Sequence, residues 1–278
     1  MAVDRIIWKM ILDFVVLACV AAPLLILLLV AEPYHRGYFA DDQTLMLPYK
    51  RQTISEGLLA GLGFAFIIVT VLPTEFILDK KGLGVGEKFV SGSLVPGWLW
   101  AGYSTIGIYT FGAACQQLTS NSAKYVIGRL RPHFFDVCNP IPSSSSQNAG
   151  GYIQDFTCQG TDAARLKDMR LSFPSAHSSF AMYTAVFFIL YVQVKGKWRG
   201  SKLLRHAAQF LALMGAWYVG LSRVVDHMHH WSDVAVGFAV GALYAVVVFV
   251  YVLKPVTFSS TVRWDNPPPE IPRPVLSR

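Results

Sequence analysis

Six long apolar segments constrain the fold of this chain more than any other feature. They cover approximately residues 6–30, 54–78, 98–119, 174–194, 205–225 and 232–254. Each is close to the roughly 20 residues that a helix needs to cross the hydrocarbon core of a bilayer. Hydrophobic residues make up 53% of the sequence and charged residues only 15%, which is unlike a soluble domain. The sequence therefore predicts an all-α polytopic membrane protein with six transmembrane helices.

The first segment has the basic start of a signal peptide, because Arg5 and Lys9 precede its apolar run. That run continues through LLILLLVA, past the length of a cleavable signal. We therefore expect a retained helix. The fifth segment is the weakest candidate, because charged residues begin and end it.

Lys and Arg residues predict the orientation of the helices. In a chain with six spans, the side that holds both termini carries 14 of them and the opposite side carries 10. Cytoplasmic loops carry the excess of positive charge, and the short loop at 195–205 has five positive residues and no acid. Both termini are therefore predicted to be cytoplasmic. No basic tract is dense enough to indicate a nucleic-acid partner.

The connections divide the chain into one large unit and a tail. Residues 1–255 form the predicted membrane domain, with an outer loop at 120–173. Residues 256–278 are rich in proline and lack periodic apolar residues, which predicts a disordered cytoplasmic tail. Cys138 and Cys158 lie in the outer loop, on the side where conditions are oxidising, so we predict a disulfide between them.

Three polar stretches border the spans on the predicted non-cytoplasmic side. They are KYVIGRLRP at 124–132, FPSAHSS at 173–179 and SRVVDHMHHWSD at 222–233. Ionisable groups next to a membrane span are costly, so their gathering on one side indicates a functional site. We expect the active site at this membrane boundary, either on the extracellular or on the lumenal face.

The residue types in these stretches suit a phosphate group and proton transfer. Fixed cations, a hydroxyl and helix N-terminal amides are groups that bind phosphate. The phosphate-binding candidates are Lys124, Arg131, Ser175, Ala176 and Arg223. His177 and His229 can move protons near neutral pH. If residues 229–233 are helical, Asp233 can accept the ring N–H of His229 and make the other ring nitrogen a better nucleophile.

A metal site and a run of polar filler are the alternatives. His229 and His230 are adjacent and point apart on a helix, and cations rather than carboxylates dominate the other two stretches, so we predict no metal and no cofactor. His227 and His230 are interpreted as supporting or solvated residues. Asp226 is expected to pair with a cation and Arg129 to lie at the surface or against a headgroup.

The three stretches resemble the signatures of the lipid phosphate phosphatases of the type 2 phosphatidate phosphatase superfamily. Those signatures read K-x6-R-P, P-S-G-H and S-R-x5-H-x3-D, and the first and third match in full. The similarity extends over about residues 4–255 and includes HRGYF, FGAACQQLT and RPHFFDVC. The resemblance implies six spans with a site that faces away from the cytoplasm.

The resemblance also implies a reaction in two steps without a metal. His229 would attack the phosphorus of a lipid phosphate monoester, Asp233 would orient it, and His177 would protonate the departing alkoxide. Water would then hydrolyse the phosphohistidine. The implied substrates are phosphatidate, lysophosphatidate, sphingosine 1-phosphate and ceramide 1-phosphate, in the plasma membrane or an endomembrane. The family also suggests a homo-oligomer.

Ala176 departs from the signature, which has glycine at this position. If the position needs only a close approach of the backbone, a methyl group is tolerated, whereas a positive φ would be strained. One alternative is therefore a weak or silent membrane protein that binds lipid phosphates or partner proteins. Vanadate-dependent halide oxidation in a similar anion cradle is another, although it suits soluble chains better.

Overall fold

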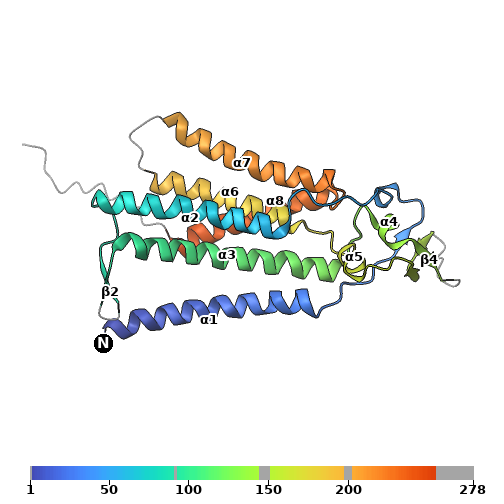
Figure 1. Ribbon diagram of the computed structural model, residues 1–278, viewed down its shortest axis with the longest axis horizontal. Helices are drawn as coiled ribbons and strands as arrows, with labels where there is room; N and C mark the ends of the chain where they lie inside the picture. The colour runs from blue at the N-terminus through green and yellow to red at the C-terminus, as the bar shows by residue number, and fades with distance from the viewer. Residues whose placement is uncertain (1, 91–92, 144–150, 197–201, 255–278) are drawn as a thin grey trace, which may run out of the picture.

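The protein is described by a computed structural model that covers residues 2–90, 93–143, 151–196 and 202–254. Its long helices lie side by side along the longest axis of the molecule, and the short elements gather mainly at one end (Figure 1). The predicted tail at 256–278 lies outside the described residues.

Six long helices form the bundle within the described residues. They are α1 (Ala2–Leu29), α2 (Glu56–Lys80), α3 (Gly97–Ile127), α6 (Ala176–Lys195), α7 (Lys202–Val225) and α8 (Trp231–Val247), and the π-helical η2 (Val248–Leu253) extends α8. The remaining helices are η1 (Gln43–Leu45), α4 (Phe134–Cys138) and α5 (Ala163–Asp168).

The described part of the chain also forms three two-stranded antiparallel ribbons, so the fold is mostly helical rather than strictly all-α. They pair β1 (Tyr38–Phe39) with β5 (Tyr152–Ile153), β2 (Lys88–Val90) with β3 (Ser93–Val95), and β4 (Pro140–Pro142) with β6 (Phe156–Cys158). All three lie in connections between the long helices, where short extended segments satisfy one another's backbone groups. Sequence periodicity does not reveal strands of two or three residues.

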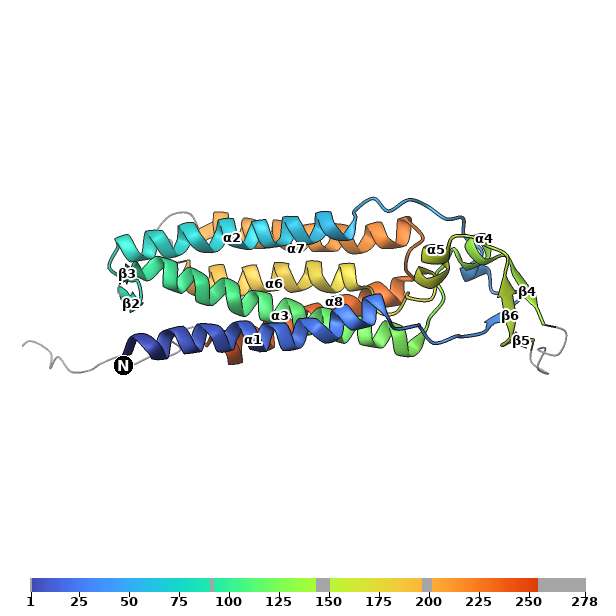
Figure 2. The ribbon, with the colours of Figure 1, turned by 60° about the horizontal axis from the view of Figure 1, so that its bottom comes forward.

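Over the ranges that the structure describes, five of the long helices are long and apolar enough to cross a bilayer. These segments are Ile6–Leu29, Glu56–Lys80, Ala176–Lys195, Leu203–Val225 and Trp231–Leu253. The predicted span at 98–119 lies in α3, which is long enough but carries many Gly, Ser, Thr and Tyr residues. A turned view shows α3 running beside α1 and α2 along the bundle (Figure 2).

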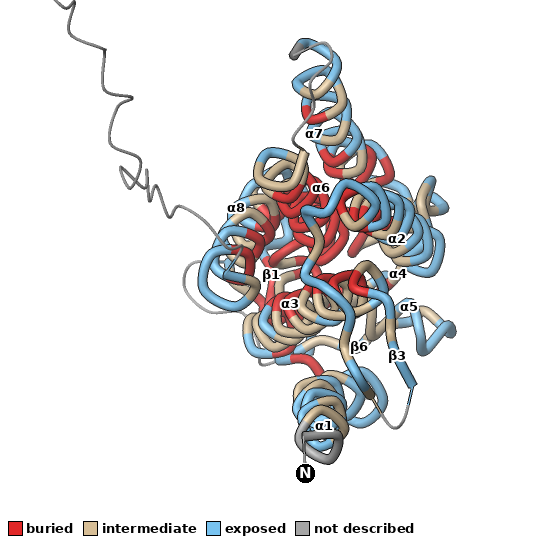
Figure 3. The backbone as a smooth tube through the Cα atoms, turned by 90° about the vertical axis from the view of Figure 1, so that its left-hand side faces the viewer, coloured by how far each residue is buried: buried red, intermediate tan, exposed pale blue. Residues whose placement is uncertain are grey.

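Helix α6 is the centre of the bundle. It packs against α2, α3, α7 and α8, and most of its residues are buried, whereas α1 contacts chiefly α3 and is largely exposed (Figure 3). Aromatic side chains fill the contact between α3 and α6, where the Tyr109 hydroxyl lies 2.8 Å from the Thr184 hydroxyl. The Tyr183 hydroxyl donates to the Tyr109 carbonyl over 2.8 Å. These bonds satisfy the polar groups inside an apolar core.

Two glycines let α8 approach α6 closely. A Cβ atom at Gly237 would lie 2.6 Å from the Ser175 carbonyl oxygen, and one at Gly241 would lie 2.1 Å from the Ser179 carbonyl oxygen. The spacing is that of a small-xxx-small helix contact, in which missing side chains allow the backbones to touch. This contact fixes the start of α8 beside the start of α6.

The connection after α3 begins at Gly128, eight residues later than the predicted outer loop at 120–173. The helix continues because Ser120, Asn121 and Lys124 are buried against the rest of the bundle rather than solvated. Beyond it, Cys138 and Cys158 form a disulfide that joins the end of α4 to β6. A small apolar cluster packs around this disulfide at the end of the molecule.

Candidate active site

The three polar stretches meet at one end of the bundle. Lys124 lies in the last turn of α3, Ser175 is the N-cap of α6, and Arg223 lies in the last turn of α7. His229 lies in the short connection before α8, and Asp233 lies in the first turn of that helix. The backbone N–H of Ser175 donates to the Asp233 carbonyl over 3.0 Å, which ties the starts of α6 and α8 together.

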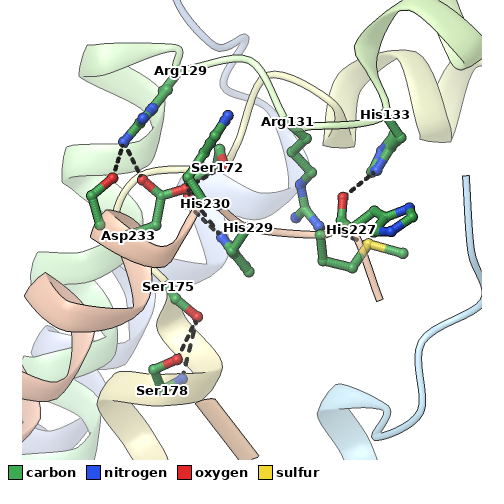
Figure 4. Close-up of polar contacts among 12 residues, drawn as sticks. Arg129, Arg131, His133, Ser172, Ser175, Ser178, His227, His229, His230 and Asp233 are labelled. Carbon is green, nitrogen blue, oxygen red and sulfur yellow. Dashed lines mark hydrogen bonds and ion pairs between the residues drawn. The ribbon is translucent and has the colours of Figure 1, made fainter. Parts of the chain in front are cut away.

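His229 is buried, with 2% of its surface exposed, and its ring is held by one hydrogen bond. Its Nδ1 donates to the Ser172 carbonyl over 2.7 Å (Figure 4). Because a carbonyl oxygen can only accept, Nδ1 carries the proton and Nε2 carries the free lone pair. Burial, together with the positive charges of Arg131 and Lys124, lowers the pKa of His229 to about 3. The neutral, nucleophilic form of the ring is therefore favoured.

Asp233 does not accept the ring N–H of His229, contrary to our prediction. Helix α8 begins only at Trp231, so His229 lies outside it, and its Nδ1 is 3.8 Å from Asp233 Oδ2. The carboxylate accepts instead from the Ser172 hydroxyl over 2.6 Å and from the His230 backbone N–H over 3.0 Å. The latter bond caps the helix, since residue N3 reaches back to the N-cap.

Arg129 is a partner of Asp233 rather than only a surface residue. Its Nη1 lies 2.5 Å from Asp233 Oδ1 and 2.9 Å from the Ser232 hydroxyl, while 31% of its side chain remains exposed. Gly128 makes this possible, because its φ of 57° ends α3 in the left-handed region and turns the chain. A Cβ at Gly128 would also lie 2.1 Å from the Tyr34 carbonyl oxygen.

The two arginines among the predicted phosphate-binding residues are buried, and each has a carboxylate partner. Arg131 Nη2 lies 2.6 Å from Asp168 Oδ1, and Arg223 Nη2 lies 2.9 Å from Asp226 Oδ2. The expected pairing of Asp226 with a cation is therefore confirmed, whereas Asp168 was not recognised from the sequence. Lys124 is 4% exposed, and its side-chain ammonium has no hydrogen bond or ion pair with the residues that the structure describes.

The first turn of α6 presents unpaired donors and a histidine. The Ser175 hydroxyl accepts from the Ser178 N–H and hydroxyl, as a helix cap does. Within the described chain, the amides of Ala176 and His177 have no acceptor, and His177 Nε2 is buried without a partner. Ala176 begins the helix and is not among the described residues with positive φ, so its methyl group causes no backbone strain.

A cavity of about 670 Å³ opens beside these residues. The charged and polar lining of one end includes Glu56, Lys124, Lys167, Asp168 and His177, with Ala176 beside them. The rest is mostly apolar and is formed by α1, α2 and α3, including Leu17, Leu24, Leu59 and Phe64. One end of the cavity is therefore polar and carries charges of both signs, and the other is suited to hydrocarbon.

The segment before α2 is hydrogen-bonded to the connection that contains His229 and holds it in position. Asp226 accepts from the Thr53 N–H and hydroxyl, at 2.8 and 2.7 Å. His227 bonds through Nδ1 to the Pro48 carbonyl over 2.8 Å, and its carbonyl lies 2.8 Å from His133 Nδ1. His227 is therefore a supporting residue, and its φ of 56° belongs to this tight turn. These long-range contacts carry no local sequence signal.

Metal ligands do not cluster in the described residues, among which no three His, Cys, Asp or Glu side chains are placed to hold an ion. The buried cations at the site are Lys124, Arg131 and Arg223, and ammonium and guanidinium groups are of the kind that bind phosphate oxygens. The geometry thus defines a membrane-type helical bundle with buried cations and histidines gathered at one end.

The chain belongs to the PAP2 superfamily, which it matches over residues 105–256. It is 44% identical to a putative phosphatidate phosphatase of Drosophila melanogaster over 262 residues, covering 89% of this chain and 69% of the relative. It is 41% identical to phospholipid phosphatase 2 of Mus musculus and 39% identical to phospholipid phosphatase 1 of Rattus norvegicus, each time covering 87% of this chain and 84% of the relative. No solved structure matches the chain.

Proposed function

We propose that this lipid phosphatase removes the phosphate group from lipid phosphate monoesters through a phosphohistidine intermediate. The observation that carries the proposal is the cavity whose polar end holds Lys124 and His177 and whose long wall is apolar. A lipid phosphate has the same division, with a dianionic head and a hydrocarbon chain. Phosphatidate, lysophosphatidate, sphingosine 1-phosphate and ceramide 1-phosphate all share it.

In the first step, Nε2 of His229 attacks phosphorus as the bond from phosphorus to the lipid oxygen breaks. His177 donates a proton to the departing alkoxide, which leaves as the lipid alcohol. Lys124, Arg131 and Arg223 hold the phosphoryl oxygens while their charge redistributes. The free amides of Ala176 and His177 add two donors to the same group, as at other helix N-termini that bind phosphate.

In the second step, water attacks the phosphorus and gives a proton to His177. The P–N bond breaks, inorganic phosphate leaves and Nε2 of His229 regains its lone pair. The net reaction is hydrolysis of one ester bond, and the two histidines return to their starting protonation states. The fixed cations supply the electrostatic stabilisation throughout, so the proposed route uses no metal ion.

The proposed membrane arrangement has α3 as a sixth span and both termini in the cytoplasm. The excess of Lys and Arg on the side of the termini supports this orientation. The disulfide between Cys138 and Cys158 supports it as well, because it lies at the same end of the bundle as the site and disulfides persist in oxidising compartments. The site then opens to the extracellular or lumenal leaflet.

The test is phosphate release from phosphatidate in mixed micelles containing excess EDTA. We expect the purified protein to turn over, and the His229→Ala variant to lose activity by a factor of 1,000 or more, on the order seen when a nucleophile is removed. His206→Ala is the matched control, because His206 lies in the first turns of α7 at the opposite end of the bundle. Equal activity in the His229 variant would overturn the mechanism, and activity lost only on chelation would indicate a metal.

A further inference from the structure

We propose that Ser172 is a positioning residue that couples Asp233 to the nucleophilic ring of His229, an inference that rests on the proposed function. Ser172 lies two residues before Pro174, outside the three polar stretches that the sequence singles out. It is completely buried. Its position between the two catalytic candidates gives it a role that Asp233 cannot perform directly.

All three polar groups of Ser172 are engaged at the site. Its N–H donates to the Arg129 carbonyl over 3.1 Å, its carbonyl accepts from His229 Nδ1 over 2.7 Å, and its hydroxyl donates to Asp233 Oδ2 over 2.6 Å. Arg129 in turn donates from its side chain to Asp233 Oδ1, so Arg129, Ser172 and Asp233 are all bonded to one another (Figure 4). Three chain segments that are distant in sequence are thus locked to one another by this serine.

The hydroxyl determines where the carbonyl of the same residue points. The carboxylate of Asp233 lies 3.8 Å from His229 Nδ1, too far for a hydrogen bond, so it does not itself orient the ring. It holds the Ser172 hydroxyl instead, and the Ser172 carbonyl then fixes both the direction of the ring and the proton on Nδ1. Removing the hydroxyl keeps the carbonyl group itself but removes the hydrogen bond to Asp233 that fixes its direction.

The coupling also stabilises the positive charge that the His229 ring gains during the reaction. When Nε2 bonds to phosphorus, the imidazole ring gains positive charge, and its Nδ1–H becomes a stronger donor. The Ser172 carbonyl accepts that stronger hydrogen bond. The anionic Asp233 holds Ser172 in position through the Ser172 hydroxyl. Such polar networks strengthen along their length when every member is satisfied.

The experiment compares Ser172→Ala with Ser172→Thr, which keeps the hydroxyl. We expect kcat for phosphatidate to fall about 10- to 100-fold in the alanine variant, the range for a misplaced reacting group, and to recover at least partly in the threonine variant. The inhibition constant of inorganic phosphate should stay within about twofold, because Lys124, Arg131 and Arg223 are untouched. Ser120→Ala is the matched control, since Ser120 is also completely buried and its hydroxyl bonds to Gln116 instead.

A double variant keeps the test decisive if threonine does not fit the buried position. If Ser172 acts through Asp233, then Ser172→Ala combined with Asp233→Asn is no slower than Asp233→Asn alone. Multiplicative losses, or a Ser172→Ala variant with unchanged kcat, would overturn the inference. The wild type and His229→Ala run beside them identify a failure of the proposed function itself, because then the wild type would be inactive or the histidine variant active.

Discussion

Replacing Gly241 by alanine tests whether the close contact between α6 and α8 sets the geometry of the site. The new Cβ would lie 2.1 Å from the Ser179 carbonyl oxygen, whereas ordinary contact needs at least 3.4 Å. The neighbouring atoms are backbone, which cannot rotate away, so the two helices must separate by about 1 Å. Asp233 lies two turns earlier on α8, and its carbonyl is bonded to Ser175 on α6. Separating the two helices at Gly241 therefore also displaces Asp233 and Ser175 at the site.

We expect a loss of stability of about 1–3 kcal/mol from overpacking and a fall in kcat of about 10- to 100-fold from the displaced groups. Thermal unfolding in detergent and phosphatidate turnover measure the two effects. Gly215→Ala is the matched control, because it lies in α7 and an added Cβ there meets no atom within 4 Å. A Gly241→Ala variant as stable and as active as the control would refute the reasoning.

Three further predictions use other parts of the site. His177→Ala should slow release of the lipid alcohol far more than release of p-nitrophenolate from p-nitrophenyl phosphate, because only the alkoxide needs a proton to leave; equal losses on the two substrates would contradict this role. Cys138→Ser, which opens a loop with a sequence separation of 20, should lower the free energy of unfolding by about 2–4 kcal/mol. The lowered pKa of His229 predicts that stability falls as the pH falls from 6.5 towards 3, because the unfolded chain then binds a proton that the folded site excludes. If the free energy of unfolding falls equally steeply with pH in the His229→Gln variant, the loss belongs to other groups.

The long helices could be predicted because each must bury or span a long apolar stretch. Their ends were less predictable, and α3 shows why. Its second half is polar by composition, yet Ser120 and Lys124 are buried against the bundle, so tertiary packing extended a helix that hydropathy alone would end at 119. The two- and three-residue strands depend on partners far along the chain and leave no periodic pattern.

The convergence of the three polar stretches at one end of the bundle could also be predicted, because the spans place the ends of α3 and α7 and the start of α6 on the same side. The roles of their residues stay predictions. The partners of these residues could not be predicted. Ser172 resembles any serine in a loop until its carbonyl and hydroxyl are seen against His229 and Asp233. Arg129 was interpreted as a surface contact because nothing local places it beside Asp233, 104 residues further along.

The most direct test of the account is to trap the phosphorylated protein. Phosphatidate labelled with ³²P in its phosphate group is mixed with the protein and quenched within milliseconds in alkali, in which phosphohistidine survives and phosphoserine does not. The account predicts labelled protein whose label is lost in acid and maps to the peptide containing His229, with none in the His229→Ala variant. Rapid phosphate release without any labelled intermediate, or label on another residue, would contradict it.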